Sequence, residues 1–114
     1  MDIRKLSPEI AVADQLKPAD ITQIKSLGYK SLICNRPDGE SGSQYLFEAI
    51  ARAAELSDIP AHYLPIPSTG PGPAQVAQLQ ALWPDLHKPA LFYCDTGGRS
   101  MELARLTFDG IAGG

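Results

Sequence analysis

Short apolar runs alternate along the chain with longer segments in which apolar residues recur every three or four positions. The runs at 10–13, 31–34 and 90–93 are mostly apolar and too short for independent helices, which is typical of buried strands. A further run at 62–66 contains a proline and is followed by another, so we expect an edge strand or a strand that ends early. Helical spacing predicts helices in the segments 18–27, 41–56, 76–83 and 99–108.

This alternation predicts an α/β three-layer sandwich, with a mainly parallel sheet of about four strands flanked by helices. Ser41 and Gln44 fit the capping-box pattern and predict the start of the second helix. Ligand sites in such sheets lie at the carboxyl ends of the strands. The loops 35–42, 67–73 and 94–99 leave those ends, so we expect them to converge on one cleft.

Length, charge and composition narrow the functional classes. The 114 residues suit one domain, 1–114, and the net charge of −3 argues against a nucleic-acid partner, which needs a basic surface. No apolar run approaches the roughly 20 residues of a membrane helix, and the first residues lack a signal-type stretch, so we expect a cytoplasmic protein. Two histidines and two distant cysteines do not have metal-ligand spacing, so we expect neither a metal nor another cofactor.

The candidate chemistry lies between Cys94 and Ser100, where a predicted strand passes into a predicted helix. A cysteine before a helix N-terminus faces unpaired N–H donors, which favour the nucleophilic thiolate. Gly97 and Gly98 permit the positive φ values that an anion-binding loop needs, and Arg99 can grip two oxygens of an oxyanion. We therefore predict catalytic roles for Cys94 and Arg99. The predicted anion-binding residues are Asp95, Thr96, Gly97, Gly98, Arg99 and Ser100.

Neighbouring polar residues leave alternatives open. Ser100 can hydrogen-bond the sulfur or cap the helix. Asp95 opposes both thiolate formation and anion binding, so it either points to solvent or pairs with Arg36 or another base. Arg36 either adds to the anion site or forms a structural ion pair. Asp38 is a candidate catalytic acid or a turn residue before a glycine, and Glu40 is expected to be solvated or to face a helix dipole.

The loop Cys94-x-x-Gly97-x-Arg99-Ser100 and the segment 31–40, which ends in Cys-Asn-Arg-Pro-Asp-Gly-Glu, resemble the phosphatase-like domain family of beta-lactamase-hydrolase-like proteins. The resemblance runs from Ile3 to Leu106. It implies a fold like that of dual-specificity tyrosine phosphatases. In that family the domain occurs alone or fused to a persulfide-dioxygenase-like domain, which implies sulfur metabolism and makes a protein of that type a candidate partner.

Two details favour sulfur over phosphate chemistry. Four residues separate Cys94 from Arg99, as in rhodanese-type loops, whereas tyrosine phosphatases have five. Positions 68–70 hold Ser, Thr and Gly where phosphatases of this type carry a general acid, and sulfur transfer needs none. We therefore expect a small anionic substrate and a sulfurtransferase that forms a Cys94 persulfide from thiosulfate or a thiol persulfide. The alternatives are a small phosphatase that acts through a cysteinyl-phosphate, and a weak oxyanion- or partner-binding module.

Overall fold

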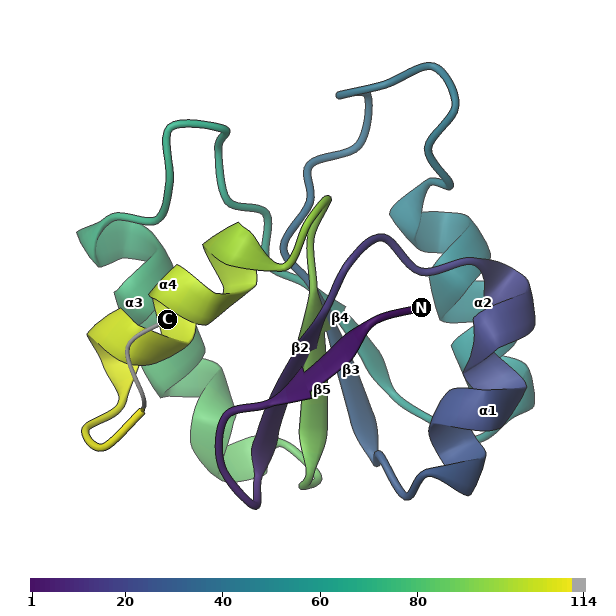
Figure 1. Cartoon of the computed structure of the whole chain (residues 1–114), viewed down its shortest axis with the longest axis horizontal. Helices are drawn as coiled ribbons and strands as arrows, with labels where there is room; N and C mark the ends of the chain where they lie inside the picture. The colour runs from purple at the N-terminus through teal and green to yellow at the C-terminus, as the bar shows by residue number, and fades with distance from the viewer. Residues whose placement is uncertain (112–114) are drawn as a thin grey trace.

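A five-stranded sheet lies between two layers of helices in the computed structural model, which describes residues 1–111 (Figure 1). The strands are β1 (Ile3–Lys5), β2 (Ile10–Ala13), β3 (Ser31–Cys34), β4 (Ala61–Tyr63) and β5 (Ala90–Tyr93). The helices are α1 (Ile21–Ser26), α2 (Phe47–Leu56), α3 (Pro73–Leu82) and α4 (Gly98–Thr107), with short 3-10 turns η1 (Pro18–Asp20) and η2 (Trp83–Asp85). The strand order is β1-β2-β5-β3-β4, parallel except for β1.

Side chains from successive strand residues enter two separate cores. Leu32 and Leu91 pack with α1 and α2 on one face of the sheet, which is the right-hand side of Figure 1. Ile33 and Phe92 pack with α3 and α4 on the other face. Because β2, β3 and β5 are covered on both faces, their sequences are apolar at consecutive positions.

The predicted α/β sandwich is confirmed, and β1 is an addition to it. β1 pairs antiparallel with the free edge of β2, and two of its three residues are exposed. An edge strand with so little apolar content has no periodicity that a sequence pattern can reveal. Pro65 and Pro67 act as expected, since β4 is an edge strand that ends at Tyr63. Beyond it, the N–H groups of Leu64 and Ile66 still donate to the carbonyls of Cys34 and Asn35.

The predicted start of the second helix is wrong. Gln44 does accept a hydrogen bond from the Ser41 N–H, at 2.9 Å, but this contact closes a turn and α2 begins only at Phe47. The first helical N–H, that of Phe47, is instead satisfied by the Asp38 carboxylate at 2.9 Å. A long-range contact, which a local pattern does not contain, therefore sets this helix end.

The carboxyl ends of the parallel strands lie together at the upper edge in Figure 1. There the Asn35 N–H donates to the Tyr93 carbonyl at 2.7 Å, so the chains stay paired as they leave β3 and β5. Of the three loops expected to converge, 35–42 and 94–99 are in direct contact, and the chain comes close to them just before 67–73. Arg99 donates both to Glu40 of the 35–42 loop and to the carbonyl of Ile66, which precedes the 67–73 loop.

Replacing Leu91 with Ala should destabilise the fold by about 2–5 kcal/mol, because it opens a cavity in the central strand of the sheet. Leu91 is fully buried, between β2 and β3. Urea unfolding followed by circular dichroism measures the loss. Leu56→Ala is the matched control, since Leu56 is 84% exposed and its truncation should change stability by less than about 0.5 kcal/mol. Equal losses from the two substitutions would contradict this description of the core.

Candidate active site

Cys94 lies one residue beyond β5, and backbone contacts fix its position. Its N–H donates to the Ala13 carbonyl at the end of β2, at 3.3 Å. The residue is almost fully buried, and its Sγ accepts a hydrogen bond from the Gly97 N–H at 3.0 Å. The sulfur therefore already has one backbone donor of the kind that stabilises a thiolate.

Gly97 is required where the loop turns into α4. The reason is its φ of +94°, which lies in the left-handed region, whereas a Cβ at this position would make only an ordinary contact of 3.5 Å with the Ala13 carbonyl oxygen. Gly98 differs from the expectation, because it is the first residue of α4 and does not have a positive φ. The Gly98 N–H donates to the Thr96 hydroxyl at 3.3 Å, so Thr96 contributes to the turn.

The Arg99 guanidinium is held by three hydrogen bonds that leave one edge available. Nη1 donates to Glu40 Oε2 at 2.8 Å and to the Ile66 carbonyl at 2.9 Å, while Nη2 donates to Glu40 Oε1 at 2.8 Å. Of the five N–H donors of an arginine, this leaves Nε–H and one on Nη2 without a bond to another described residue. These two lie side by side on the planar group, which is the geometry that binds two oxygens of an oxyanion.

Glu40 links Arg99 to Arg36, so it is part of the site and not a solvated surface carboxylate. Besides its two bonds to Arg99, its Oε1 lies 3.2 Å from Arg36 Nε. The hydrogen bond from Arg99 lowers the pKa of the Glu40 carboxyl. In return, the hydrogen-bonded carboxylate of Glu40 raises the pKa of Arg99. Both groups are therefore charged across the neutral pH range.

The buried side chain of Arg36 stabilises the 35–42 loop. Its side chain is only 9% exposed, and Nη1 donates to Gln15 Oε1 at 3.0 Å. The same Nη1 lies 3.8 Å from Asp95 Oδ1. Asp95 is expected either to point to solvent or to pair with Arg36, and it does both. Its side chain is 56% exposed and forms a long ion pair with Arg36.

Asp38 and Ser100 have structural partners. The Asp38 carboxylate accepts the hydrogen bond from Phe47 that begins α2, which is a capping contact and gives no geometric support for a role as acid. Ser100 is fully buried and neither bonds the sulfur nor caps α4; its hydroxyl donates to Asn35 Oδ1 at 2.8 Å. Asn35 in turn donates to the Leu64 carbonyl at 2.8 Å, so this buried pair ties α4 to two loops.

The second cysteine has a different environment. Cys34 is a free, buried thiol whose Sγ donates to the Arg36 carbonyl at 3.3 Å. Burial raises the pKa of this thiol, which keeps it protonated and unreactive. Within residues 1–111, no group of three or more His, Cys, Asp or Glu side chains is arranged to hold a metal ion.

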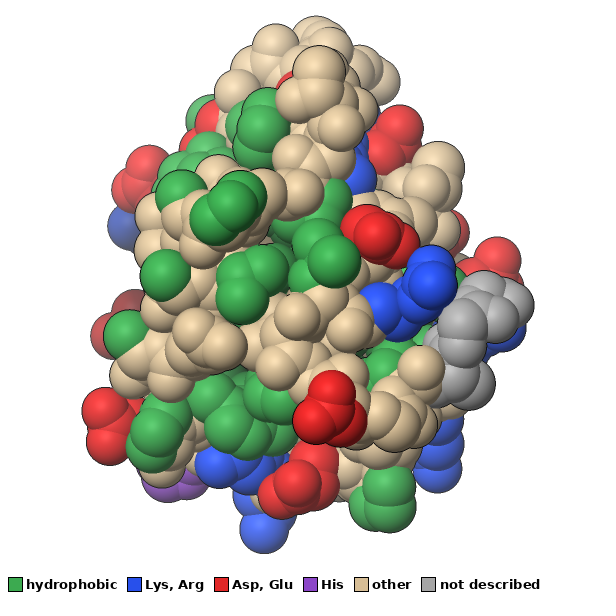
Figure 2. Space-filling model, turned by 90° about the vertical axis from the view of Figure 1, so that its left-hand side faces the viewer, with side chains coloured by type: hydrophobic (Ala, Val, Ile, Leu, Met, Phe, Trp, Pro, Cys, Tyr) green, Lys and Arg blue, Asp and Glu red, His purple; other side chains and the backbone are tan. Residues whose placement is uncertain are grey.

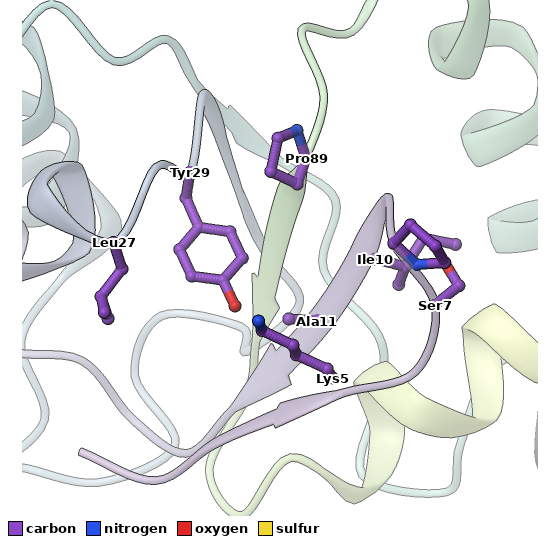
Figure 3. A pocket seen from close by; sticks show the side chains of 8 residues that line it. Lys5, Ser7, Ile10, Ala11, Leu27, Tyr29 and Pro89 are labelled. Atoms are coloured by element: carbon purple, nitrogen blue, oxygen red, sulfur yellow. The ribbon is translucent and has the colours of Figure 1, made fainter.

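Two hollows lie near the ends of the sheet. One of about 100 Å³ lies at the edge opposite Cys94, where the hydroxyl end of Tyr29 points toward the Lys5 side chain (Figure 3). Its lining residues are Lys5, Ser7, Pro8, Ile10, Ala11, Leu27, Tyr29 and Pro89, which include no thiol, carboxylate or imidazole. The other, of about 350 Å³, adjoins the loop at Thr96, Gly97 and Gly98 and extends to Arg4 and Met101. Of the two, the second touches the Cys94–Arg99 loop, although neither Cys94 nor Arg99 lines it.

None of the helices described over residues 1–111 is long and apolar enough to cross a bilayer. The expected location in the cytoplasm stays a prediction.

Solved structures of phosphatases share this fold. A protein of Neisseria meningitidis Z2491, described as a candidate phosphatase, superposes with a TM-score of 0.80 at 35% identity, covering 87% of this chain and 70% of that chain. Kinase associated phosphatase superposes with a TM-score of 0.68 at 20% identity, covering 90% of this chain and 68% of that chain. Together these likenesses confirm the expected tyrosine-phosphatase-like fold.

Sequence relatives give the family. The beta-lactamase hydrolase-like protein of Xylella fastidiosa Temecula1 is 25% identical over 107 residues, which are 94% of this chain and 25% of that protein. The chain thus spans about a quarter of the length of this curated relative. The family model described as beta-lactamase hydrolase-like protein, phosphatase-like domain, matches residues 2–110. The chain, with its Cys94–Arg99 loop at the converging strand ends, therefore belongs to the phosphatase-like domain family of beta-lactamase hydrolase-like proteins.

Proposed function

We propose that this chain is a cysteine-dependent phosphatase that hydrolyses small phosphate esters, with Cys94 as nucleophile and Arg99 as the oxyanion-binding residue. The observation that carries the proposal is the free edge of Arg99, which faces no described partner while Glu40 and the Ile66 carbonyl hold the rest of the group. Membership of a phosphatase-like family and the likeness to solved phosphatases support the same reaction class.

The reaction has two displacements at phosphorus. In the first, the Cys94 thiolate attacks, a sulfur–phosphorus bond forms, and the bond from phosphorus to the ester oxygen breaks as that oxygen leaves with the electron pair. In the second, water attacks the cysteinyl-phosphate and loses a proton to solvent, and the sulfur–phosphorus bond breaks so that Cys94 leaves as the thiolate with the electron pair and inorganic phosphate is released. The Nε and Nη2 donors of Arg99, with the loop N–H groups other than those of Gly97 and Gly98, stabilise the charge on the equatorial oxygens in both steps.

The leaving oxygen has little help from an acid. The 67–73 loop carries no carboxyl group, the carboxylates of Asp38 and Glu40 bind Phe47 and Arg99, and that of Asp95 forms an ion pair with Arg36. General acids contribute about 10²–10⁴-fold to such steps. The proposed substrates are therefore esters with good leaving groups, such as aryl phosphates.

Sulfur transfer, which the four-residue spacing favours, finds no support in the comparisons, and neither does a persulfide-dioxygenase-type partner. The anion-binding groups of the loop suit either chemistry, because phosphate and thiosulfate are both bound by inward N–H groups and a guanidinium. The phosphatase alternative therefore takes precedence over the sulfurtransferase expectation.

Replacing Cys94 with Ser should abolish hydrolysis of 4-nitrophenyl phosphate, with a loss of about 10³-fold or more, because the covalent intermediate no longer forms. Release of 4-nitrophenolate measures the rate, and orthovanadate should inhibit the wild-type protein. Cys34→Ser, with its fold checked by circular dichroism, is the matched control and should keep the activity.

Three results would contradict the proposal, and each has a distinct meaning. Full activity in Cys94→Ser would show that Cys94 is not the nucleophile. An added sulfur on Cys94 after incubation with thiosulfate, seen by intact mass and without ester hydrolysis, would establish the sulfurtransferase reaction. Inactivity in both assays would leave an oxyanion- or partner-binding module.

Replacing Glu40 with Gln should lower kcat/KM for 4-nitrophenyl phosphate by about 10- to 100-fold, because Arg99 loses the carboxylate that orients it. Glu48→Gln is the matched control, since Glu48 lies in the first turn of α2 and has no ion pair among the described residues. Equal rates for the two variants would contradict a positioning role for Glu40.

The same Glu40→Gln variant predicts a pH dependence of stability. Because the pKa of Glu40 is lower in the folded chain than the value of about 4.3 in an unfolded one, its ion pairs stabilise the fold fully above that pH. This stabilisation is lost as pH falls through the lowered folded pKa. The difference in urea midpoint between wild type and Glu40→Gln should therefore be present at neutral pH and disappear on strong acidification. A difference that persists in acid would show that the glutamine disturbs packing and not charge.

A further inference from the structure

We propose that Asp95 determines the substrate class of this site. It favours phosphate esters whose remaining part is uncharged or cationic, and it disfavours esters that carry a second anionic group. This inference rests on the proposed phosphatase function and adds a specificity-determining residue to it.

Asp95 lies where its charge can attract or repel the part of the substrate that extends from the bound phosphate. It directly follows the nucleophile, and its backbone is fixed because its carbonyl accepts a hydrogen bond from the Gln15 N–H at 3.0 Å. Its side chain is 56% exposed, and its one described ion pair, with Arg36, is long at 3.8 Å. A carboxylate is thus held at the rim of the loop without a close cation.

The two arginines beside the loop cannot offset a further anion. The carboxylate of Glu40 binds Arg99 through two hydrogen bonds and lies 3.2 Å from Arg36 Nε. Arg36 is also the only described ion-pair partner of Asp95. The guanidinium groups of Arg36 and Arg99 are therefore matched by the carboxylates of Glu40 and Asp95. The phosphate of the substrate is bound by the loop N–H groups and the free edge of Arg99. A second anionic group would meet Asp95 without a cation of its own.

The other surroundings of the loop do not change this balance. Asp38 adds a further carboxylate on the 35–42 loop, and the hollow on the other side contains one residue of each sign, Asp2 and Arg4. On the side of Ile66, the chain has no Asp, Glu, Lys or Arg from 59 to 84. Figure 2 shows the side that carries α3, where apolar and uncharged side chains cover much of the surface and acidic and basic ones lie to the right of the middle and near the bottom. An uncharged substrate body can therefore lie along this side.

Three aryl phosphates test the inference: phenyl phosphate with a neutral para-nitro, an anionic para-carboxylate or a cationic para-trimethylammonium group. The wild-type protein should prefer the cationic over the anionic ester in kcat/KM. Asp95→Asn should lower that preference by about 10-fold, because one unit charge near the para substituent is removed. The effect of the leaving group cancels, since the same esters are compared in both proteins. High salt should reduce the wild-type preference through screening.

The control is Asp58→Asn, which removes the same charge before β4, at the opposite edge of the sheet, where the Asp58 side chain is 93% exposed. It should leave the preference unchanged. An Asp95→Asn preference within about two-fold of wild type, with hydrolysis intact, would overturn the inference and leave the phosphatase proposal standing.

If none of the three esters is hydrolysed, the phosphatase proposal fails, and binding of the same esters decides the inference. Titrations would compare Cys94→Ser with the double variant Cys94→Ser/Asp95→Asn. Tighter binding of the cationic ester that depends on Asp95 would support the charge selection. Equal binding of the three esters, or no binding at all, would overturn it.

Discussion

The bidentate contact between Glu40 and Arg99 is the interaction on which the site depends. It joins a loop after β3 to the first turn of α4, two segments 59 residues apart in the sequence. A free arginine side chain has many rotamers, and fixing one of them has an entropic cost that an incoming anion would otherwise have to offset. Here the carboxylate and the Ile66 carbonyl orient the guanidinium in advance, so its remaining edge is ready for the oxyanion.

The sheet makes this contact available. Because β3, β4 and β5 are parallel and adjacent, their carboxyl ends deliver Arg36 and Glu40, Ile66, and Cys94 to one edge. The buried hydrogen bond between Ser100 and Asn35 then locks α4 against the β3 loop. The residues that build the fold therefore also position the nucleophile, its backbone donor and the guanidinium, and few others are needed.

Much of the fold follows from patterns within the sequence, and the missing parts have identifiable physical reasons. The apolar runs predict β2, β3 and β5 because strands covered on both faces leave no room for polar residues. β1 escapes prediction because only one of its three side chains, that of Ile3, packs against the core, and the other two are exposed. α2 begins where the distant Asp38 caps it, although Ser41 and Gln44 have the local signature of a helix start.

The candidate site, like the fold, can be predicted from the sequence only in part. The sequence alone singles out Cys94, Gly97 and Arg99, because their order before a helix carries the chemistry of an anion loop. The partner of Arg99 is harder to predict, since Glu40 follows a Pro-Asp-Gly turn in which a charged residue is ordinarily solvated. The prediction that the loops converge, combined with a search for a carboxylate to match Arg99, would have pointed to Glu40.

The most direct test of the account is a crystal structure of the protein with orthovanadate. The account predicts vanadium beside Cys94 Sγ, two of its oxygens on Nε and Nη2 of Arg99, and Glu40 still bound to the other edge of the guanidinium. An oxyanion that displaces Glu40 from Arg99, or that binds outside the Cys94–Arg99 loop, would contradict it.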